Sequence, residues 1–161
     1  MKQTKHKIKR TFITVMTVVC ALSSVAAISA SANNCSDTED TYAVGGYAYK
    51  YTDAARRKED YSSSYQKCIS STVTYQSWVF ASKTAYPGSA ASNHVTLTYK
   101  GKTTPSYYFS SGTTRYMVNY INEYNDLQSN GADKYLYAGM TFWTGSTKGG
   151  STHIRWSPDS V

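Results

Sequence analysis

The sequence predicts an all-β protein, a β-sandwich of about six or seven short antiparallel strands. Three observations lead to this prediction. Apolar and polar residues alternate with a period of two in several short segments, which is the pattern of a strand with one buried face. Clusters of glycine, proline and serine separate these segments, as turns do. The 16 tyrosines, three tryptophans and four phenylalanines supply large side chains that strands favour.

Residues 1–32 have the composition of an export signal. A basic start precedes an apolar run, and the run ends in the small-residue sequence Ala30-Ser31-Ala32. This order is typical of a cleaved signal peptide. We therefore expect cleavage between Ala32 and Asn33 and a secreted, extracellular product. Threonine and serine interrupt the apolar run, so a permanent membrane anchor is the less favoured alternative.

The expected cleavage changes the charge of the protein. The whole chain has a formal net charge of +7, from 17 Lys and Arg against 10 Asp and Glu. Five of the basic residues and none of the acidic ones lie in 1–32, so residues 33–161 carry a net charge of +2. Nucleic-acid binding needs a concentrated basic patch, and the sequence therefore predicts no nucleic-acid partner. We expect a polar N-terminal arm at 33–41 and a single β-rich domain at 42–161.

Two cysteines, Cys35 and Cys68, remain after the expected cleavage. An even pair in an exported domain predicts one disulfide, which would tie the N-terminal arm to the body of the domain. The chain has no C-x-x-C motif and no clustered histidines, so the sequence predicts neither a metal site nor another cofactor.

In the first half of the domain, residues 42–51 alternate with a period of two, and paired glycines within them predict a bend or bulge. The charged stretch 53–65 alternates in sign without an apolar stripe, which predicts a solvated loop or a short surface helix. Residues 72–80 and 94–100 alternate again and are predicted strands.

Residues 115–127 fit two interpretations. Apolar residues recur at helical spacing, but alternation at 115–121 also fits a strand that pairs with the extended segment 105–109 across a Ser-Ser-Gly turn. We favour the strand and keep a short helix as the alternative. Residues 134–143 and 151–156, joined by a glycine-rich turn, complete the predicted strands.

A face of aromatic side chains lies opposite the predicted core and is the candidate binding site. Stacked aromatics suit sugar rings or protein partners because they offer a large contact area at low entropic cost. The alternative is that these side chains simply pack the sheet. The members of the predicted face are Tyr47, Tyr49, Tyr51, Trp78, Tyr135, Tyr137 and Trp143.

The sequence contains no recognisable catalytic motif, and we assign no catalytic residue. The only histidines beyond residue 32 are His94 and His153, and alternation predicts that both face outward. A hydrolase that uses either histidine therefore remains the third hypothesis for the function.

The segment Tyr135–Trp143, the following turn and residues 153–159 carry a resemblance. They resemble the C-terminal portion of small secreted proteins of Gram-positive bacteria, whose domain has no assigned function and some of which resemble lactococcin-type bacteriocins. The resemblance implies a β-sandwich exported by a Gram-positive cell. Our leading hypothesis is a non-enzymatic secreted protein that binds a cell-wall glycan or a protein at or outside the envelope. A bacteriocin-like antagonist is the alternative.

Overall fold

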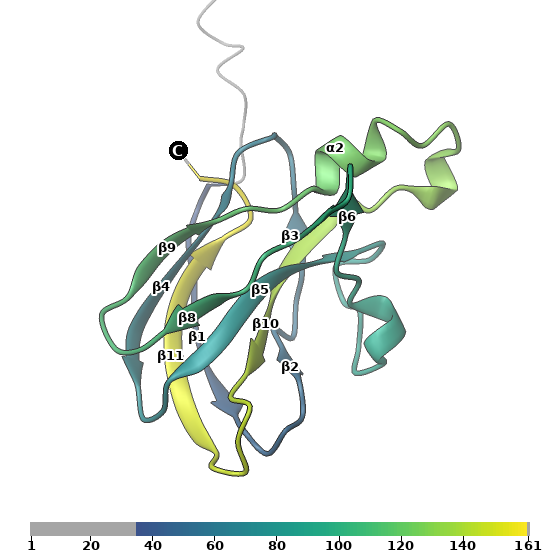
Figure 1. Ribbon diagram of the computed structural model, residues 1–161. Helices are drawn as coiled ribbons and strands as arrows, with labels where there is room; N and C mark the ends of the chain where they lie inside the picture. Colours follow the sequence, from purple (N-terminus) through teal and green to yellow (C-terminus); the bar gives the residue numbers. More distant parts are fainter. Residues whose placement is uncertain (1–34, 161) are drawn as a thin grey trace, which may run out of the picture. The chain divides into compact units, whose positions relative to one another are not determined.

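The computed structural model describes residues 35–160, which form two antiparallel sheets packed face to face (Figure 1). The predicted signal peptide and its cleavage site, Ala30, Ala32 and Asn33, lie outside the described residues. The all-β prediction is confirmed, although the strands are more numerous than expected and several contain only two residues.

The first sheet has the strand order β1-β11-β4-β9. Its strands are β1 (Thr38–Val44), β4 (Ser64–Ser71), β9 (Thr114–Met117) and β11 (Gly150–Ser157). The second sheet has the order β2-β10-β5-β8, and β3 pairs with β10 beside β2. Its strands are β2 (Lys50–Tyr51), β3 (Arg56–Arg57), β5 (Tyr75–Ser82), β8 (Tyr107–Phe109) and β10 (Tyr137–Trp143).

Short elements complete the described chain. The hairpin β6 (Thr98–Tyr99) and β7 (Lys102–Thr103) forms a separate small sheet. The helical elements are the 3-10 turns η2 (Ala91–Asn93) and η3 (Gly131–Asp133) and the α-helix α2 (Ile121–Asn125). Within residues 35–160, no helix has the length and hydropathy needed to span a membrane.

Aromatic rings from both sheets fill the space between them. The rings of Tyr42 on β1 and Phe142 on β10 stack with centroids 5.1 Å apart. Tyr75 on β5 contacts Phe142 at 5.8 Å and Phe109 at 5.6 Å. Each fully buried apolar side chain of this size stabilises the fold by about 1.5–3 kcal/mol. On the predicted strand 151–156, Ile154 and Trp156 face the core and are almost completely buried.

A polar network lies inside this core and links the sheets. The Gln66 amide nitrogen donates to the Tyr75 hydroxyl at 3.0 Å, and the Thr152 hydroxyl donates to the same oxygen at 3.2 Å. The Ser77 hydroxyl donates to the Gln66 amide oxygen at 2.7 Å. Burial of these polar groups is tolerated because they hydrogen-bond to one another. Burial also raises the pKa of Tyr75, so its hydroxyl stays protonated.

The ambiguous segment contains both a strand and a helix. Strand β9 ends at Met117 and helix α2 begins at Ile121, and both of these side chains are buried. The predicted pairing of 105–109 with 115–121 is wrong, because β8 pairs with β5 while β9 pairs with β4. The turn between them carries the chain from one sheet to the other.

The predicted N-terminal arm is wrong from Thr38 onward. Residues 38–44 form the edge strand β1, which pairs with β11 along its whole length. Glu39 faces outward and accepts a hydrogen bond from Arg155 at 2.7 Å. The sequence of β1 looks like a loop because the outer face of an exposed edge strand is polar.

The predicted disulfide is not formed, since Cys35 and Cys68 are both free cysteines. Cys68 lies on β4 opposite Ile154 of β11, and its side chain is buried. Strand β1 lies on the other side of β11, two strand spacings or about 9–10 Å away. Cys35 precedes Thr38, which pairs farther along β11 at Trp156. A disulfide needs Cα atoms within about 7 Å, and this register keeps the cysteines apart.

The charged stretch 53–65 is neither a surface helix nor a fully solvated loop. Strand β3 pairs with β10 within it, and the Arg56 guanidinium donates to the Thr38 hydroxyl at 3.0 Å. Lys58 follows immediately and is 5% exposed. A lysine can be buried in this way when its ammonium group is paired with a carboxylate. The alternating charges of the sequence do not show which carboxylate lies beside it.

Candidate functional site

The outer face of the second sheet carries three of the predicted aromatic residues close together. In the register of β5 and β10, Trp78 lies opposite Thr141 and Gln76 lies opposite Trp143. Directly opposed residues of an antiparallel pair project from the same face of the sheet. The inward positions of both strands are occupied by buried side chains such as Met140, so the two tryptophans lie on the outer face.

Tyr49 completes the group from the β2 side of the sheet. Its ring meets Trp78 edge to face with centroids 5.5 Å apart, and it meets Trp143 at 6.2 Å with a tilt of 56°. Tyr49 is 52% exposed, and both tryptophans are half-buried. We call these three residues the outer aromatic cluster.

A groove of about 310 Å³ runs along the outer aromatic cluster. Its lining combines three aromatic side chains with four polar ones. The Trp78 indole nitrogen donates to the Thr96 hydroxyl at 3.1 Å, which fixes the plane of the indole. The Gln76 amide nitrogen donates to the Tyr108 hydroxyl at 2.9 Å. The lining residues are Tyr49, Gln76, Trp78, Thr96, Thr104, Ser106 and Trp143.

The turn after β10 leaves room for the Trp143 ring. Gly145 has a φ of +64°, and a Cβ atom at that position would lie 3.3 Å from the edge of the indole. Glycine adopts this left-handed conformation without steric cost, and the missing side chain lets the indole lie across the turn. The glycine-rich segment that the sequence shows as a turn therefore also positions one side of the groove.

Tyr51 lies beside the cluster but is covered. Its ring stacks on His94 with centroids 3.7 Å apart, and it meets Phe80 edge to face at 5.8 Å. His94 is 8% exposed, so the prediction that it faces outward is wrong. Its Nδ1 atom lies 2.9 Å from the Ala90 carbonyl oxygen, and burial lowers its pKa. The segment after η2 folds back over the sheet and brings His94 onto Tyr51.

His153 faces outward, as predicted. Its Nε2 atom lies 3.0 Å from a carboxylate oxygen of Glu39 on the neighbouring strand. Arg155 binds the same carboxylate, so the outer face of the first sheet carries a small charged network. The structure thus holds the two histidines in different environments, with His153 on β11 of the first sheet and His94 in the loop that packs on Tyr51.

The remaining predicted members of the aromatic face lie elsewhere. Tyr135 packs against Tyr124 at 5.6 Å and lies under the Lys83 ammonium group at 5.6 Å. Tyr47 is exposed in the turn after β1, and Tyr137 is half-buried at the opposite end of β10 from Trp143. The predicted face is therefore divided, and only its part around Trp143 forms a continuous group.

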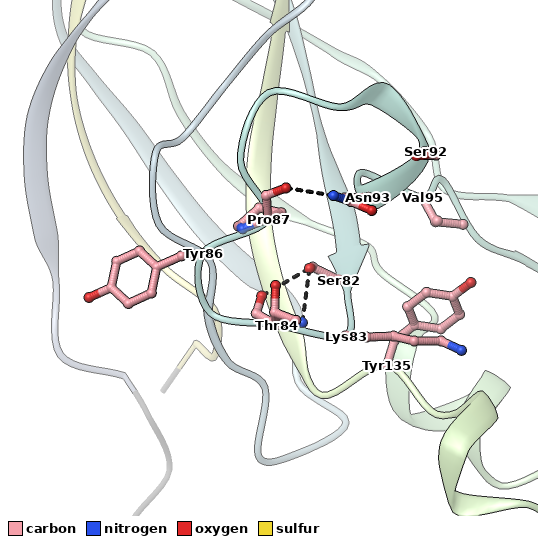
Figure 2. A pocket seen from close by; sticks show the side chains of 9 residues that line it. All are labelled: Ser82, Lys83, Thr84, Tyr86, Pro87, Ser92, Asn93, Val95 and Tyr135. Atoms are coloured by element: carbon pink, nitrogen blue, oxygen red, sulfur yellow. Dashed lines mark hydrogen bonds between the residues drawn. The ribbon is translucent and has the colours of Figure 1, made fainter.

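A larger hollow of about 490 Å³ lies beside Tyr135 (Figure 2). Two of its polar side chains bond to backbone groups of the same lining. The Asn93 amide nitrogen donates to the Pro87 carbonyl at 2.7 Å, and the Ser82 hydroxyl donates to the Thr84 carbonyl at 2.9 Å. The lining of this hollow contains Tyr86 and Tyr135 but no tryptophan, unlike the groove beside the outer aromatic cluster.

Comparison with known proteins identifies the family. A family model described as "Protein of unknown function (DUF2712)" matches residues 28–160. The chain belongs to the DUF2712 family. The match covers both sheets of this DUF2712 protein, whereas the resemblance seen in the sequence covered only the last part of the chain. No curated protein and no solved structure matches the chain significantly.

Sequence reasoning missed the polar half of the groove in this DUF2712 protein. Gln76 and Tyr108 lie 32 residues apart in the sequence and meet because β5 pairs with β8. Residues 94–100 were predicted to form one strand, but only Thr98–Tyr99 do so, and no local pattern places Thr96 against Trp78. The alternation of residues 72–80 was the available signal, because it puts Gln76 and Trp78 on one face.

Proposed function

We propose that this DUF2712 protein is exported and binds cell-wall glycans at the outer aromatic cluster, without catalysing a reaction. The observation that supports this function best is the grouping of Tyr49, Trp78 and Trp143 along a groove that polar side chains also line. A sugar ring has an apolar face, which packs on an aromatic ring, and a rim of hydroxyl groups, which need hydrogen-bond partners. The groove supplies both kinds of contact.

The framework around the cluster favours a preformed site. The indole of Trp78 is oriented by Thr96, and Trp143 is held against Gly145. Side chains that are already ordered lose little conformational entropy when they bind a ligand. The net charge of +2 on residues 33–161 imposes no strong requirement for a charged ligand. These features suit a neutral or weakly charged oligosaccharide.

Binding to isolated Gram-positive cell walls and titration with soluble wall glycan fragments test the proposal. Tyr49→Ala and Trp143→Ala should each weaken binding by about threefold to tenfold, since an aromatic contact contributes about 0.5–1.5 kcal/mol. Tyr116→Ala is the matched control, because Tyr116 is 62% exposed on β9 of the other sheet. It should bind as the wild type does.

Two results would overturn the proposal. The first is wild-type protein that sediments with neither intact walls nor glycan fragments. The second is binding that disappears when the walls are treated with protease, because that result identifies a protein partner. The antagonist and hydrolase hypotheses from the sequence stay predictions, to be checked by inhibition of related strains and by substitution of His94 and His153.

A further inference from the structure

A buried pair of opposite charges joins two distant parts of the chain. Lys58 follows β3 and Asp159 follows β11, and they are 101 positions apart in the sequence. The side chains of both residues are 0% exposed, and the Lys58 ammonium nitrogen directly contacts the Oδ1 atom of Asp159. Burial of a full positive and a full negative charge carries a large desolvation cost, which a neutral arrangement of the same groups avoids.

The backbone on both sides of the pair is fixed. The Lys58 amide donates to the Leu136 carbonyl at 3.0 Å. The Ser64 hydroxyl donates to the Pro158 carbonyl at 2.8 Å, and the Ser157 hydroxyl donates to the Asp159 carbonyl at 2.6 Å. The two side chains are therefore held in contact by the fold, which raises their effective concentration toward each other.

A second carboxylate lies against the same ammonium group. The Oδ1 atom of Asp60 is 2.9 Å from the Lys58 nitrogen, and the Ser62 backbone amide donates to that oxygen at 2.8 Å. Partial burial alone would raise the pKa of Asp60. The hydrogen bonds from Ser62 and Lys58 outweigh it and hold this pKa below the usual value for an aspartate. Asp60 is therefore an ionised carboxylate, and its position in contact with the Lys58 nitrogen is what lets it carry a proton away once that nitrogen has formed a new bond.

Backbone amides point at the Asp159 carboxyl group. The Glu59 amide lies 3.2 Å from Oδ2 and 3.4 Å from Oδ1, and the Asp60 amide lies 3.5 Å from Oδ1. Amide donors in this position stabilise the negative charge that develops on a carboxyl oxygen when a nucleophile attacks its carbon. The site therefore combines an amine, a carboxyl carbon, a proton acceptor and an oxyanion-stabilising pair of amides.

We propose that Lys58 and Asp159 form an intramolecular isopeptide bond, with Asp60 as the catalytic proton carrier. Proton transfer within the buried pair gives a neutral amine and a neutral carboxylic acid. The Lys58 nitrogen attacks the Asp159 Cγ atom, and Asp60 takes a proton from that nitrogen and delivers it to the departing hydroxyl oxygen. The Nζ–Cγ bond forms, one Cγ–O bond breaks, and one water molecule leaves. No oxidant, reductant or co-reactant is needed.

Peptide mapping of the folded protein, expressed from the full-length sequence, tests the bond directly. Circular dichroism first establishes that the preparation has its β-structure. Trypsin cannot cleave after a lysine whose side chain is acylated. The digest should therefore contain peptide 58–67 joined to the peptide that begins at Trp156, lighter by one water molecule than the two together. Ordinary cleavage after Lys58, together with a free peptide from Trp156, would overturn the proposal.

Variants distinguish an isopeptide bond from a simple ion pair between Lys58 and Asp159. Lys58→Arg keeps the positive charge but lacks the nucleophilic amine, so the joined peptide should disappear. Asp60→Asn removes the proton acceptor and should reduce the joined fraction at least tenfold after a fixed time. Asp53→Asn is the matched control, because Asp53 is exposed and has no part in the proposed site. An unchanged joined fraction in Asp60→Asn would remove Asp60 from the mechanism.

Discussion

At the scale of single residues, His94 shows how packing changes the chemistry of a titratable group. Its ring is stacked on Tyr51 and meets the edge of Phe80 at 4.6 Å. Burial lowers the pKa of His94 below its ordinary value of 6.5, although the contact with Ala90 acts in the opposite direction. The neutral ring is therefore the form that the folded protein prefers.

This preference predicts a pH dependence of stability. The unfolded chain binds a proton at His94 more readily than the folded chain, so the free energy of unfolding falls as pH decreases below about 6.5. The contribution is fully present above pH 6.5 and is lost as pH falls toward the lower folded pKa. Urea denaturation at pH 7.5 and 5.5 measures how much the free energy of unfolding falls between the two pH values. This fall should be smaller for His94→Phe than for the wild type. Equal losses in both proteins would contradict this role for His94.

At the scale of elements, the packing over the paired strands β5 and β10 depends on a residue without a side chain. Gly139 lies directly opposite Phe80, and the Phe80 ring covers it. A Cβ atom at position 139 would lie 2.3 Å from the Phe80 ring and 2.6 Å from the Thr52 hydroxyl. The absence of a side chain there lets the aromatic ring lie flat over the neighbouring strand.

Gly139→Ala should therefore destabilise the fold by about 1–3 kcal/mol, as overpacking in a full interior does. It should also disturb the stack of Tyr51 on His94, because Phe80 touches both rings. Chemical denaturation measures the change in the free energy of unfolding. Gly131→Ala is the control, since a Cβ atom at that position meets nothing within 4 Å. A loss that is equal in both variants would show that packing over Gly139 is not the cause.

The strands that the sequence predicted share a simple physical property. Strands β10 and β11 have large apolar side chains facing the core, and their alternation was visible in the sequence. Strand β4 was not predicted, because its inward residues are Ser64, Gln66 and Cys68. These residues belong to the polar part of the interior, so the usual contrast between apolar and polar faces is missing.

At the scale of the whole molecule, the predicted route of export remains to be measured. Protein recovered from the medium of a Gram-positive expression host should begin at Asn33, because the small residues Ala30 and Ala32 predict cleavage after Ala32. N-terminal sequencing checks this directly. Ala30→Lys should leave uncleaved precursor in the cell fraction, since the recognition site needs small residues. A secreted product that retains residues 1–32 would contradict the prediction.

The candidate site could be predicted only in part. Alternation places Trp78 and Trp143 each on the outer face of its strand, but it cannot state that the two strands are neighbours. The same reasoning grouped Tyr135 with them, although Tyr135 lies before β10 and packs on Tyr124. Local patterns define the face of a strand on which a side chain lies, and they do not define which strand lies beside it.

The sequence by itself determined the class of fold, the inward faces of the most apolar strands and the positions of several turns, because these depend on residues close together in the chain. Only the tertiary structure decided which strands pair, that Cys35 and Cys68 stay apart, and that Lys58 meets Asp159 across 101 positions. Backbone hydrogen bonds between strands are nearly the same for every sequence. Strand partners are therefore selected by packing of the complete interior, which no short stretch of sequence contains.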